Sequence, residues 1–281
     1  GSNLWLSSGF VLAEGTCKII ALHDCDILTY DRELLARLVF PLASPHMDYE
    51  FCKGFYARVS DRLYGRVTRL LVTPLIRALQ HVLYRESQLL GFLDSFRYPL
   101  SGEFSMLADL ARINRIPADW GLEMGVLCEV FRNCTARRIC QVELCDTYEH
   151  KHQHLSADDD RKGLMKMSID IAKSLFRNMA TDGMVLSDAL FKTLTVRYLR
   201  AAQDAVKQYE DDAAINGLPF DRHQELLAVR AFTNAVRLAA DEYLRDPLGI
   251  PLISNWNRVT SAIPDFFGRL KDVVDRDKNG K

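Results

Sequence analysis

The sequence has 281 residues, of which 48% are hydrophobic and 26% charged, and its formal net charge is −1. This is ordinary globular composition for one large domain or two modest ones, and the charge argues against a general affinity for nucleic acid or anionic membranes. No apolar run approaches a membrane span, and seven scattered cysteines without a C-x-x-C pair favour reduced thiols in the cytoplasm over a zinc ribbon or a disulfide framework.

The N-terminal part of the chain predicts a helix that leads into a central strand. Residues 4–14 carry apolar side chains at helical spacing, and the short apolar run 19–22 is typical of a strand covered on both faces, as in a parallel sheet. Asp24 and Asp26 follow the strand, at the end where open α/β sheets bind ligands. In an extended segment both carboxylates point the same way, so they predict a cation site, against the alternative of two solvated acids in a loop.

The next part of the chain predicts a basic loop between a strand and a helix. Residues 31–39 predict a helix stopped by Pro41, and the aromatic run 49–58 predicts a strand. A loop follows, and it opens a helix over residues 70–83. Backbone N–H groups, a hydroxyl and a guanidinium converge there in an anion cradle, or alternatively form a solvated basic turn. The residues concerned are Gly65, Arg66 and Thr68.

A turn and two helices precede the last predicted strand. Pro99 and Gly102 indicate that residues 96–105 form a turn rather than an element, and helices are expected over 106–112 and from 119 to 131. Glu123 stands near the start of the second helix, where the helix dipole favours a carboxylate.

The last predicted strand, over residues 139–144, leads into a segment rich in histidine. His150, His152 and His154 alternate there and could chelate a divalent ion, against the alternative of a polar, solvated loop. His150 is the best placed of the three, at the mouth of the same sheet as Asp26.

The C-terminal part of the chain predicts helices. Residues 164–179, 186–209 and 224–244 have apolar residues at helical spacing and show no catalytic constellation. They predict a helical region that covers the sheet or pairs subunits, and the charged stretch 273–281 is expected to be frayed.

Four stretches together resemble the glucosyl-3-phosphoglycerate synthases and their mannosyl relatives, which are retaining glycosyltransferases of the GT-A fold. They occur in the family's order, with sensible spacings, within residues 1–153. The stretches are Asp24-Cys25-Asp26, Gly65-Arg66-Val67-Thr68, Pro99-Leu100-Ser101-Gly102-Glu103 and Gly121-Leu122-Glu123-Met124-Gly125.

The resemblance implies an α/β fold with a Rossmann-like mixed sheet. A catalytic core over residues 1–155 would be followed by a mostly helical region over 156–281. The family's first βαβ unit, which holds the nucleobase, has no counterpart in this sequence, so we expect such a unit to be missing from it.

The resemblance also implies roles for individual residues. Asp26 and His150 would hold Mg²⁺ or Mn²⁺ on the donor diphosphate. Two carboxylates would serve the reaction, with Asp24 on the donor nucleoside or sugar and Glu123 on the sugar hydroxyls. The remaining residues are Leu100 and Ser101 for the donor-sugar pocket and Gly65, Arg66, Thr68 and His152 for the acceptor's phosphate or carboxylate.

Two positions depart from the family pattern. The family has an Arg two residues before the metal-binding His and an Asn two residues after it, where this sequence has Tyr148 and His152. Both positions lie near the donor phosphate and the acceptor, so the departures bear on the identity of the two substrates.

The implied activity is transfer of glucose, or mannose, from a nucleotide diphosphate sugar to 3-phosphoglycerate with retention, a step in compatible-solute synthesis. UDP-glucose is the expected donor, with GDP-glucose and GDP-mannose as alternatives, and the enzyme is expected to be a cytoplasmic homodimer. Retention with no enzyme nucleophile would leave the acceptor's proton to the departing diphosphate. The competing interpretations are a non-catalytic GT-A-like interaction protein and a sugar nucleotidyltransferase.

Overall fold

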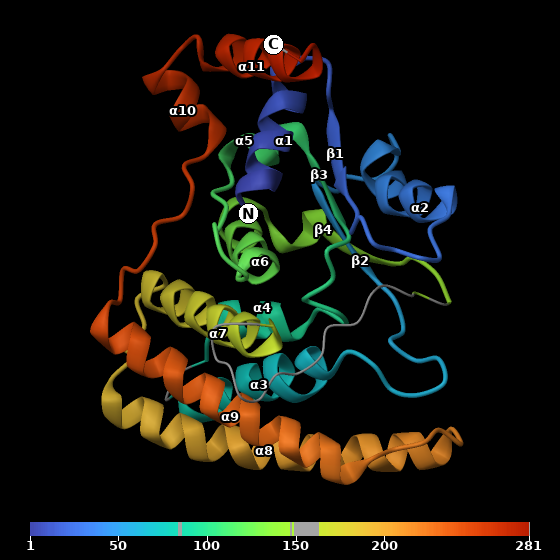
Figure 1. The fold of residues 1–281 in the computed structure, drawn as a ribbon, viewed down its shortest axis with the longest axis vertical. Helices are drawn as coiled ribbons and strands as arrows, with labels where there is room; N and C mark the ends of the chain where they lie inside the picture. The colour runs from blue at the N-terminus through green and yellow to red at the C-terminus, as the bar shows by residue number, and fades with distance from the viewer. Residues whose placement is uncertain (84–85, 147, 149–162, 281) are drawn as a thin grey trace.

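The computed structural model describes residues 1–83, 86–146, 148 and 163–280, which form a mixed sheet flanked by helices above a helical layer (Figure 1). In the sheet order β1-β3-β2-β4, β3 is antiparallel to β1 and β2, and β4 is parallel to β2. β1, β2 and β4 therefore run in one direction and end at the same edge, which confirms the predicted α/β class. The strands are β1 (Ile19–Leu22), β2 (Phe51–Phe55), β3 (Phe104–Leu107) and β4 (Ile139–Glu143).

Two expectations about the sheet are wrong. β1 is not a doubly covered strand of a parallel sheet, because it pairs antiparallel with β3 and all four of its residues are only half-buried. The stretch expected to be only a turn leads directly into β3, and α5 (Ala108–Ile113) begins two residues later than predicted. Phe104 and Met106 lie on one face of β3 and Ser105 on the other, as in any strand. The alternation was not recognised because the strand is short and directly follows the turn.

The two faces of the sheet pack against different helices. α2 (Arg32–Ala43) covers one face, where Leu34 and Leu38 meet Cys52 of β2. The Asp31 side chain caps this helix by accepting a hydrogen bond from the N–H of Glu33. The helix continues through Pro41 for the rest of its last turn instead of stopping there. The helices on the opposite side are α1 (Ser2–Ala13), α5 and α6 (Leu122–Asn133) (Figure 1).

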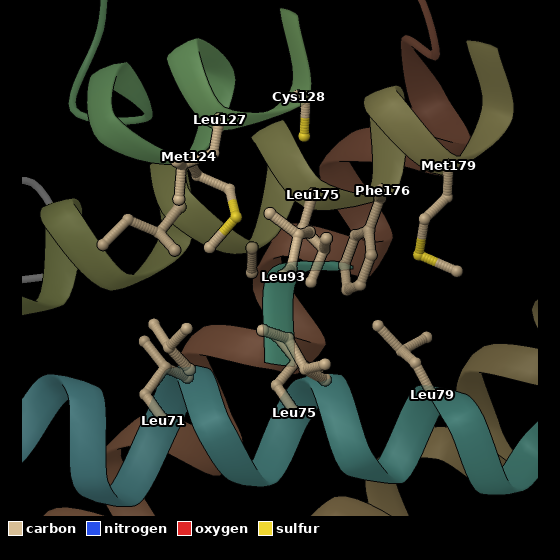
Figure 2. Packing of buried hydrophobic residues seen from close by; sticks show 14 of the residues in the cluster. Leu71, Leu75, Leu79, Leu93, Met124, Leu127, Cys128, Leu175, Phe176 and Met179 are labelled. Carbon is tan, nitrogen blue, oxygen red and sulfur yellow. The ribbon is translucent and has the colours of Figure 1, made fainter. Parts of the chain in front are cut away.

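A layer of long helices lies below the sheet and shares its hydrophobic core with α6. Figure 2 shows Leu71, Leu75 and Leu79 pointing towards Leu127 of α6 and Phe176 of α7. The long C-terminal helices pack mainly against other helices of this core rather than on the sheet. Their predicted role in pairing subunits stays a prediction. The elements are a π-helical turn (Thr68–Val72), α3 (Thr73–Val82), α4 (Gln88–Asp94), α7 (Gly163–Thr181), α8 (Asp188–Ile215) and α9 (Arg222–Arg245).

The last two helices return to the N-terminal helix. Trp256 of α10 (Trp256–Ala262) stacks on Trp5 of α1 with ring centroids 4.0 Å apart, beside α11 (Phe266–Lys278) (Figure 1). The expected fraying over residues 273–281 is therefore wrong for most of that stretch, because α11 extends to Lys278. None of the helices in the described parts of the chain is long and apolar enough to cross a membrane.

Candidate active site

The segment that follows β1 meets the turn that precedes β3 at the carboxyl edge of the sheet. Asp24 is exposed and Asp26 half-buried in the turn after β1. The Asp24 carboxylate lies over Gly102, where an added Cβ would stand 2.2 Å from Oδ1. Only glycine leaves this space, because any side chain at position 102 would displace the carboxylate. The structure thus brings together two of the four stretches that carry the resemblance.

A buried lysine of β2 connects these stretches to a third. Lys53 is 1% exposed, and its ammonium donates a hydrogen bond to the carbonyl oxygen of Ser101. Burial lowers the pKa of Lys53 to about 8, against the opposing charges of Glu123, Asp24 and Glu103. The charges of the predicted residues Asp24 and Glu123 therefore act on the same buried ammonium that donates to the Ser101 carbonyl. Sequence reasoning missed Lys53, although a lysine within an apolar and aromatic strand was a visible signal.

The residues predicted to bind the donor sugar differ in their burial and in the hydrogen bonds that they make within the protein. Burial raises the pKa of Glu123 in the first turn of α6, and Lys53 counteracts the rise. Ser101 is fully buried, and its hydroxyl accepts a hydrogen bond of 3.0 Å from the N–H of Glu103. The Ser101 hydroxyl thus shapes the turn, whereas Leu100 is half-buried against the core.

Replacing Lys53 by Met is expected to change how stability depends on pH. The folded-state pKa is about 8 against the ordinary 10.5, so between these values the unfolded chain binds one more proton than the folded chain. As the pH rises through this window, the unfolding free energy of the wild type should therefore increase by up to about 3 kcal/mol relative to that of Lys53→Met. Denaturant unfolding below pH 8 and at pH 10.5 measures the difference. Lys192→Met, which removes an exposed lysine paired with Asp188, is the control, and parallel curves for wild type and Lys53→Met would contradict the assignment.

A second buried ionisable group, Glu103, was also missed from the sequence. It is fully buried just before β3, and its Oε1 accepts hydrogen bonds from the N–H of Asp24 (2.9 Å) and the hydroxyl of Tyr148 (2.8 Å). The imidazole of His23 contacts Oε2. The Tyr148 ring stacks on Tyr56, with centroids 3.5 Å apart and an interplanar angle of 7°. The position where the family has an Arg is therefore occupied here by a buried tyrosine that binds Glu103.

The predicted acceptor loop is held by the C-terminal helices. Gly65 adopts a φ of +69°, a conformation that favours glycine, and Thr68 is buried at the start of the π-helical turn. The guanidinium of Arg66 donates two hydrogen bonds, of 2.9 and 2.7 Å, to Oε1 of Glu225 in α9. Arg69 contacts the other oxygen of Glu225 at 3.1 Å. A region expected to carry no site residue thus supplies the partner of the predicted acceptor arginine.

The carboxylates that follow β1 suit a hard divalent ion, but they need further ligands to complete its coordination. Two carboxylates, of Asp24 and Asp26, follow β1, and carboxylate oxygens are the ligands that Mg²⁺ prefers. His150 and His152 lie outside the described residues. In the part of the chain that the structure describes, no three side chains of His, Cys, Asp or Glu gather into a complete metal site. Since Mg²⁺ is commonly held by one or two carboxylates together with substrate phosphates and water, Asp26 fits the ion as one of its ligands.

Comparison with known proteins identifies the family. No family model matches the chain. Glucosyl-3-phosphoglycerate synthase from Persephonella marina is 50% identical over 99% of this chain and 69% of its own length. The enzyme of the same name from Methanococcoides burtonii is 40% identical over 97% of this chain and 67% of its own. A crystal structure of glucosyl-3-phosphoglycerate synthase from Mycobacterium tuberculosis with Mn²⁺, UDP-glucose and phosphoglyceric acid matches 61% of this chain and 53% of its own, at 24% identity and a TM-score of 0.48. The alignments with the first two relatives span almost the whole chain, so the chain belongs to the glucosyl-3-phosphoglycerate synthase family.

Proposed function

We propose that the protein transfers glucose from a nucleotide diphosphate sugar, UDP-glucose first among the candidates, to 3-phosphoglycerate with retention of configuration. The observation that carries this proposal is identity of 50% and 40%, over nearly the whole chain, to two enzymes named for that product. The interaction of Lys53 with the Ser101 carbonyl and with the charges of Asp24 and Glu123 supports it, because these residues come from three of the stretches that resemble the family. The glucosyl name of both relatives favours glucose over mannose.

The proposed reaction exchanges one bond at the anomeric carbon. The bond from this carbon to the diphosphate oxygen breaks, a bond to the acceptor's hydroxyl oxygen forms, and the proton of that hydroxyl passes to the departing diphosphate. Glu123 accepts hydrogen bonds from the sugar hydroxyls, while Leu100 and the Ser101 backbone border the sugar. Asp24 contacts the donor from the opposite segment. The chain then binds and orients the reactants, and the diphosphate acts as the base.

A divalent ion completes the donor site in this proposal. Asp26, with His150 as expected from the resemblance, would hold Mg²⁺ or Mn²⁺. When bound, the ion stabilises the negative charge that builds up on the departing diphosphate. One imidazole beside carboxylate ligands extends tolerance from Mg²⁺ to Mn²⁺.

The acceptor side of the proposal rests on the loop that precedes α3. Gly65, Arg66 and Thr68 would hold the phosphate or the carboxylate of 3-phosphoglycerate, and His152 would lie beside them. An arginine fork suits either anion, since it donates two parallel charge-assisted hydrogen bonds. In the structure the Arg66 guanidinium donates both hydrogen bonds to one oxygen of the Glu225 carboxylate, and this affinity for a carboxylate supports the proposed role.

Product analysis of the purified full chain tests the proposed function. With UDP-glucose, 3-phosphoglycerate and Mg²⁺, we expect UDP and glucosyl-3-phosphoglycerate in equal amounts, with the α-anomeric configuration of the donor retained in the product. Mass spectrometry identifies the product, and NMR of its anomeric proton reports the configuration. Release of pyrophosphate from a nucleoside triphosphate and a sugar phosphate would instead indicate a nucleotidyltransferase. No product from any nucleotide sugar would favour the non-catalytic interaction protein.

We further propose a homodimer, in keeping with the predicted role of the C-terminal helices. Light scattering of the full chain measures the mass directly, and a monomeric mass at micromolar concentration would contradict this assembly.

A further inference from the structure

Glu103 lies where the ends of three strands meet, and its own backbone is firmly held. Its carbonyl accepts a hydrogen bond of 2.8 Å from the N–H of Gly54 in β2, and its N–H donates to the Ser101 hydroxyl. The side chain is fully buried, so its carboxylate stays in one place relative to the sheet. It therefore offers a fixed acceptor at the edge where the candidate site lies.

The partners of this carboxylate come from two segments far apart in the sequence. The N–H of Asp24, 79 residues before Glu103, and the Tyr148 hydroxyl, 45 residues after it, donate to the same oxygen, Oε1. Asp24 leaves the end of β1 and Tyr148 follows the end of β4. One carboxylate thus ties together the segments that follow the two outer strands of the described sheet.

This arrangement differs from that of other buried acids in the chain. Glu129 accepts hydrogen bonds from Arg115 and Arg132, and Glu225 is held by Arg66 and Arg69. Glu103 accepts hydrogen bonds from a backbone N–H and a phenol, and an imidazole contacts its other oxygen. A buried carboxylate is costly unless it is well hydrogen-bonded. This cost falls beside the D-x-D segment, where the Glu103 carboxylate accepts the hydrogen bond from the Asp24 N–H.

We propose that Glu103 is a positioning residue that fixes the Asp24–Asp26 segment in the geometry needed to bind the divalent ion and the donor diphosphate. The inference rests on the proposed function for the identity of the ligand, but the contact with Asp24 stands independently of it. Glu103 itself touches neither the ion nor the substrates. It acts by holding the N–H of Asp24, two residues before Asp26, as partners behind metal ligands do in other proteins.

Two isosteric replacements separate the hydrogen bonds of Glu103 from its bulk. Glu103→Met fills the space but accepts no strong hydrogen bond, so we expect Mn²⁺ affinity, measured by electron paramagnetic resonance, to fall about 10- to 100-fold. Glu103→Gln keeps Oε1 as an acceptor for both donors and should recover most of the affinity. Glu129→Met, which removes an equally buried acid held by arginines, is the matched control and should leave Mn²⁺ affinity unchanged.

Hydrogen exchange of the metal-free protein provides a reading that does not depend on the ion. In Glu103→Met, peptides covering residues 23–27 should exchange faster than in the wild type, while Glu103→Gln and Glu129→Met should not differ there. Tyr148→Phe, a milder change that retains the ring stack on Tyr56, should weaken Mn²⁺ binding about two- to tenfold and secures the test if Glu103→Met does not fold.

The outcomes distinguish this inference from the proposed function. If the wild type binds no Mn²⁺, the metal-dependent function fails, and exchange at residues 23–27 still decides the role of Glu103. If the wild type binds Mn²⁺, but Glu103→Met binds it as tightly with unchanged exchange at residues 23–27, the positioning role is overturned. Where Glu103→Met does not fold, an unchanged Mn²⁺ affinity in Tyr148→Phe overturns it.

Discussion

Asp26→Ala is expected to lower kcat/KM for glucose transfer by about 10²–10³-fold, which corresponds to roughly 3–4 kcal/mol of transition-state stabilisation. The physical reason is the loss of a carboxylate ligand to the ion that stabilises the departing diphosphate. Asp26 lies half-buried in a turn beyond the end of β1, so its replacement should leave the sheet intact. Steady-state kinetics at saturating Mg²⁺ or Mn²⁺, together with calorimetry of nucleotide-sugar binding, measure the effect. The same loss is expected for His150→Ala.

The control for this substitution lies in the same turn. Cys25 is exposed between the two acids, and Cys25→Ala leaves both carboxylates in place, so kcat/KM should stay at the wild-type value. EDTA should abolish turnover in all variants. Full activity in EDTA, or an unchanged Mn²⁺ affinity in Asp26→Ala, would remove Asp26 from the metal site.

Arg66→Ala is expected to raise the KM for 3-phosphoglycerate by one to two decades while leaving the KM for the nucleotide sugar unchanged. Each charge-assisted hydrogen bond of an arginine fork contributes roughly 1.5–3 kcal/mol, and about 1.4 kcal/mol corresponds to one decade. Arg66→Lys keeps the charge but loses the fork and should recover only part of the affinity. Kinetics with each substrate varied in turn separate the two constants.

The pairing of Arg66 with Glu225 determines the controls for this experiment. In Arg66→Ala the buried Glu225 carboxylate keeps Arg69 as a partner at 3.1 Å, so the fold should hold. Arg62→Ala, which removes an exposed arginine of the same loop paired with Asp61, should change neither KM. Glu225→Gln in the Arg66→Ala background should not restore acceptor binding. If it does, or if the donor KM rises instead, Arg66 does not bind the acceptor.

The sequence pattern predicted the helices that have long apolar repeats and the strands that consist of an apolar or aromatic run. The strand before Asp24, the strand containing Phe51 and the three long C-terminal helices have such patterns, and each is present in the structure. β3 was missed because four residues directly after a Pro- and Gly-containing turn carry too short an alternation. Its antiparallel insertion between β1 and β2 is a matter of pairing between distant segments, which a local pattern does not record.

The sequence predicted the site residues that belong to motifs, but it did not predict the residues that hold them in place. Asp24, Ser101 and Glu123 belong to recognisable stretches, and in the structure the Ser101 carbonyl and the charges of both acids act on Lys53. Glu103 was visible as the last letter of such a stretch, but its contacts with Asp24 and Tyr148 depend on the sheet register. The ion pair between Arg66 and Glu225 joins positions 159 residues apart, so only the folded chain reveals it.

The hydrophobic cluster shared by α3, α6, α7 and α8 has a consequence for thermal inactivation. Tyr198 of α8 is fully buried, and its hydroxyl donates to the carbonyl of Leu70 in the turn that follows the Arg66 loop. Melting of α8 would therefore remove a hydrogen bond and packing contacts that support this loop. Heat that melts α8 should accordingly abolish catalysis over the same temperature interval, which circular dichroism and activity measured on the same samples would compare.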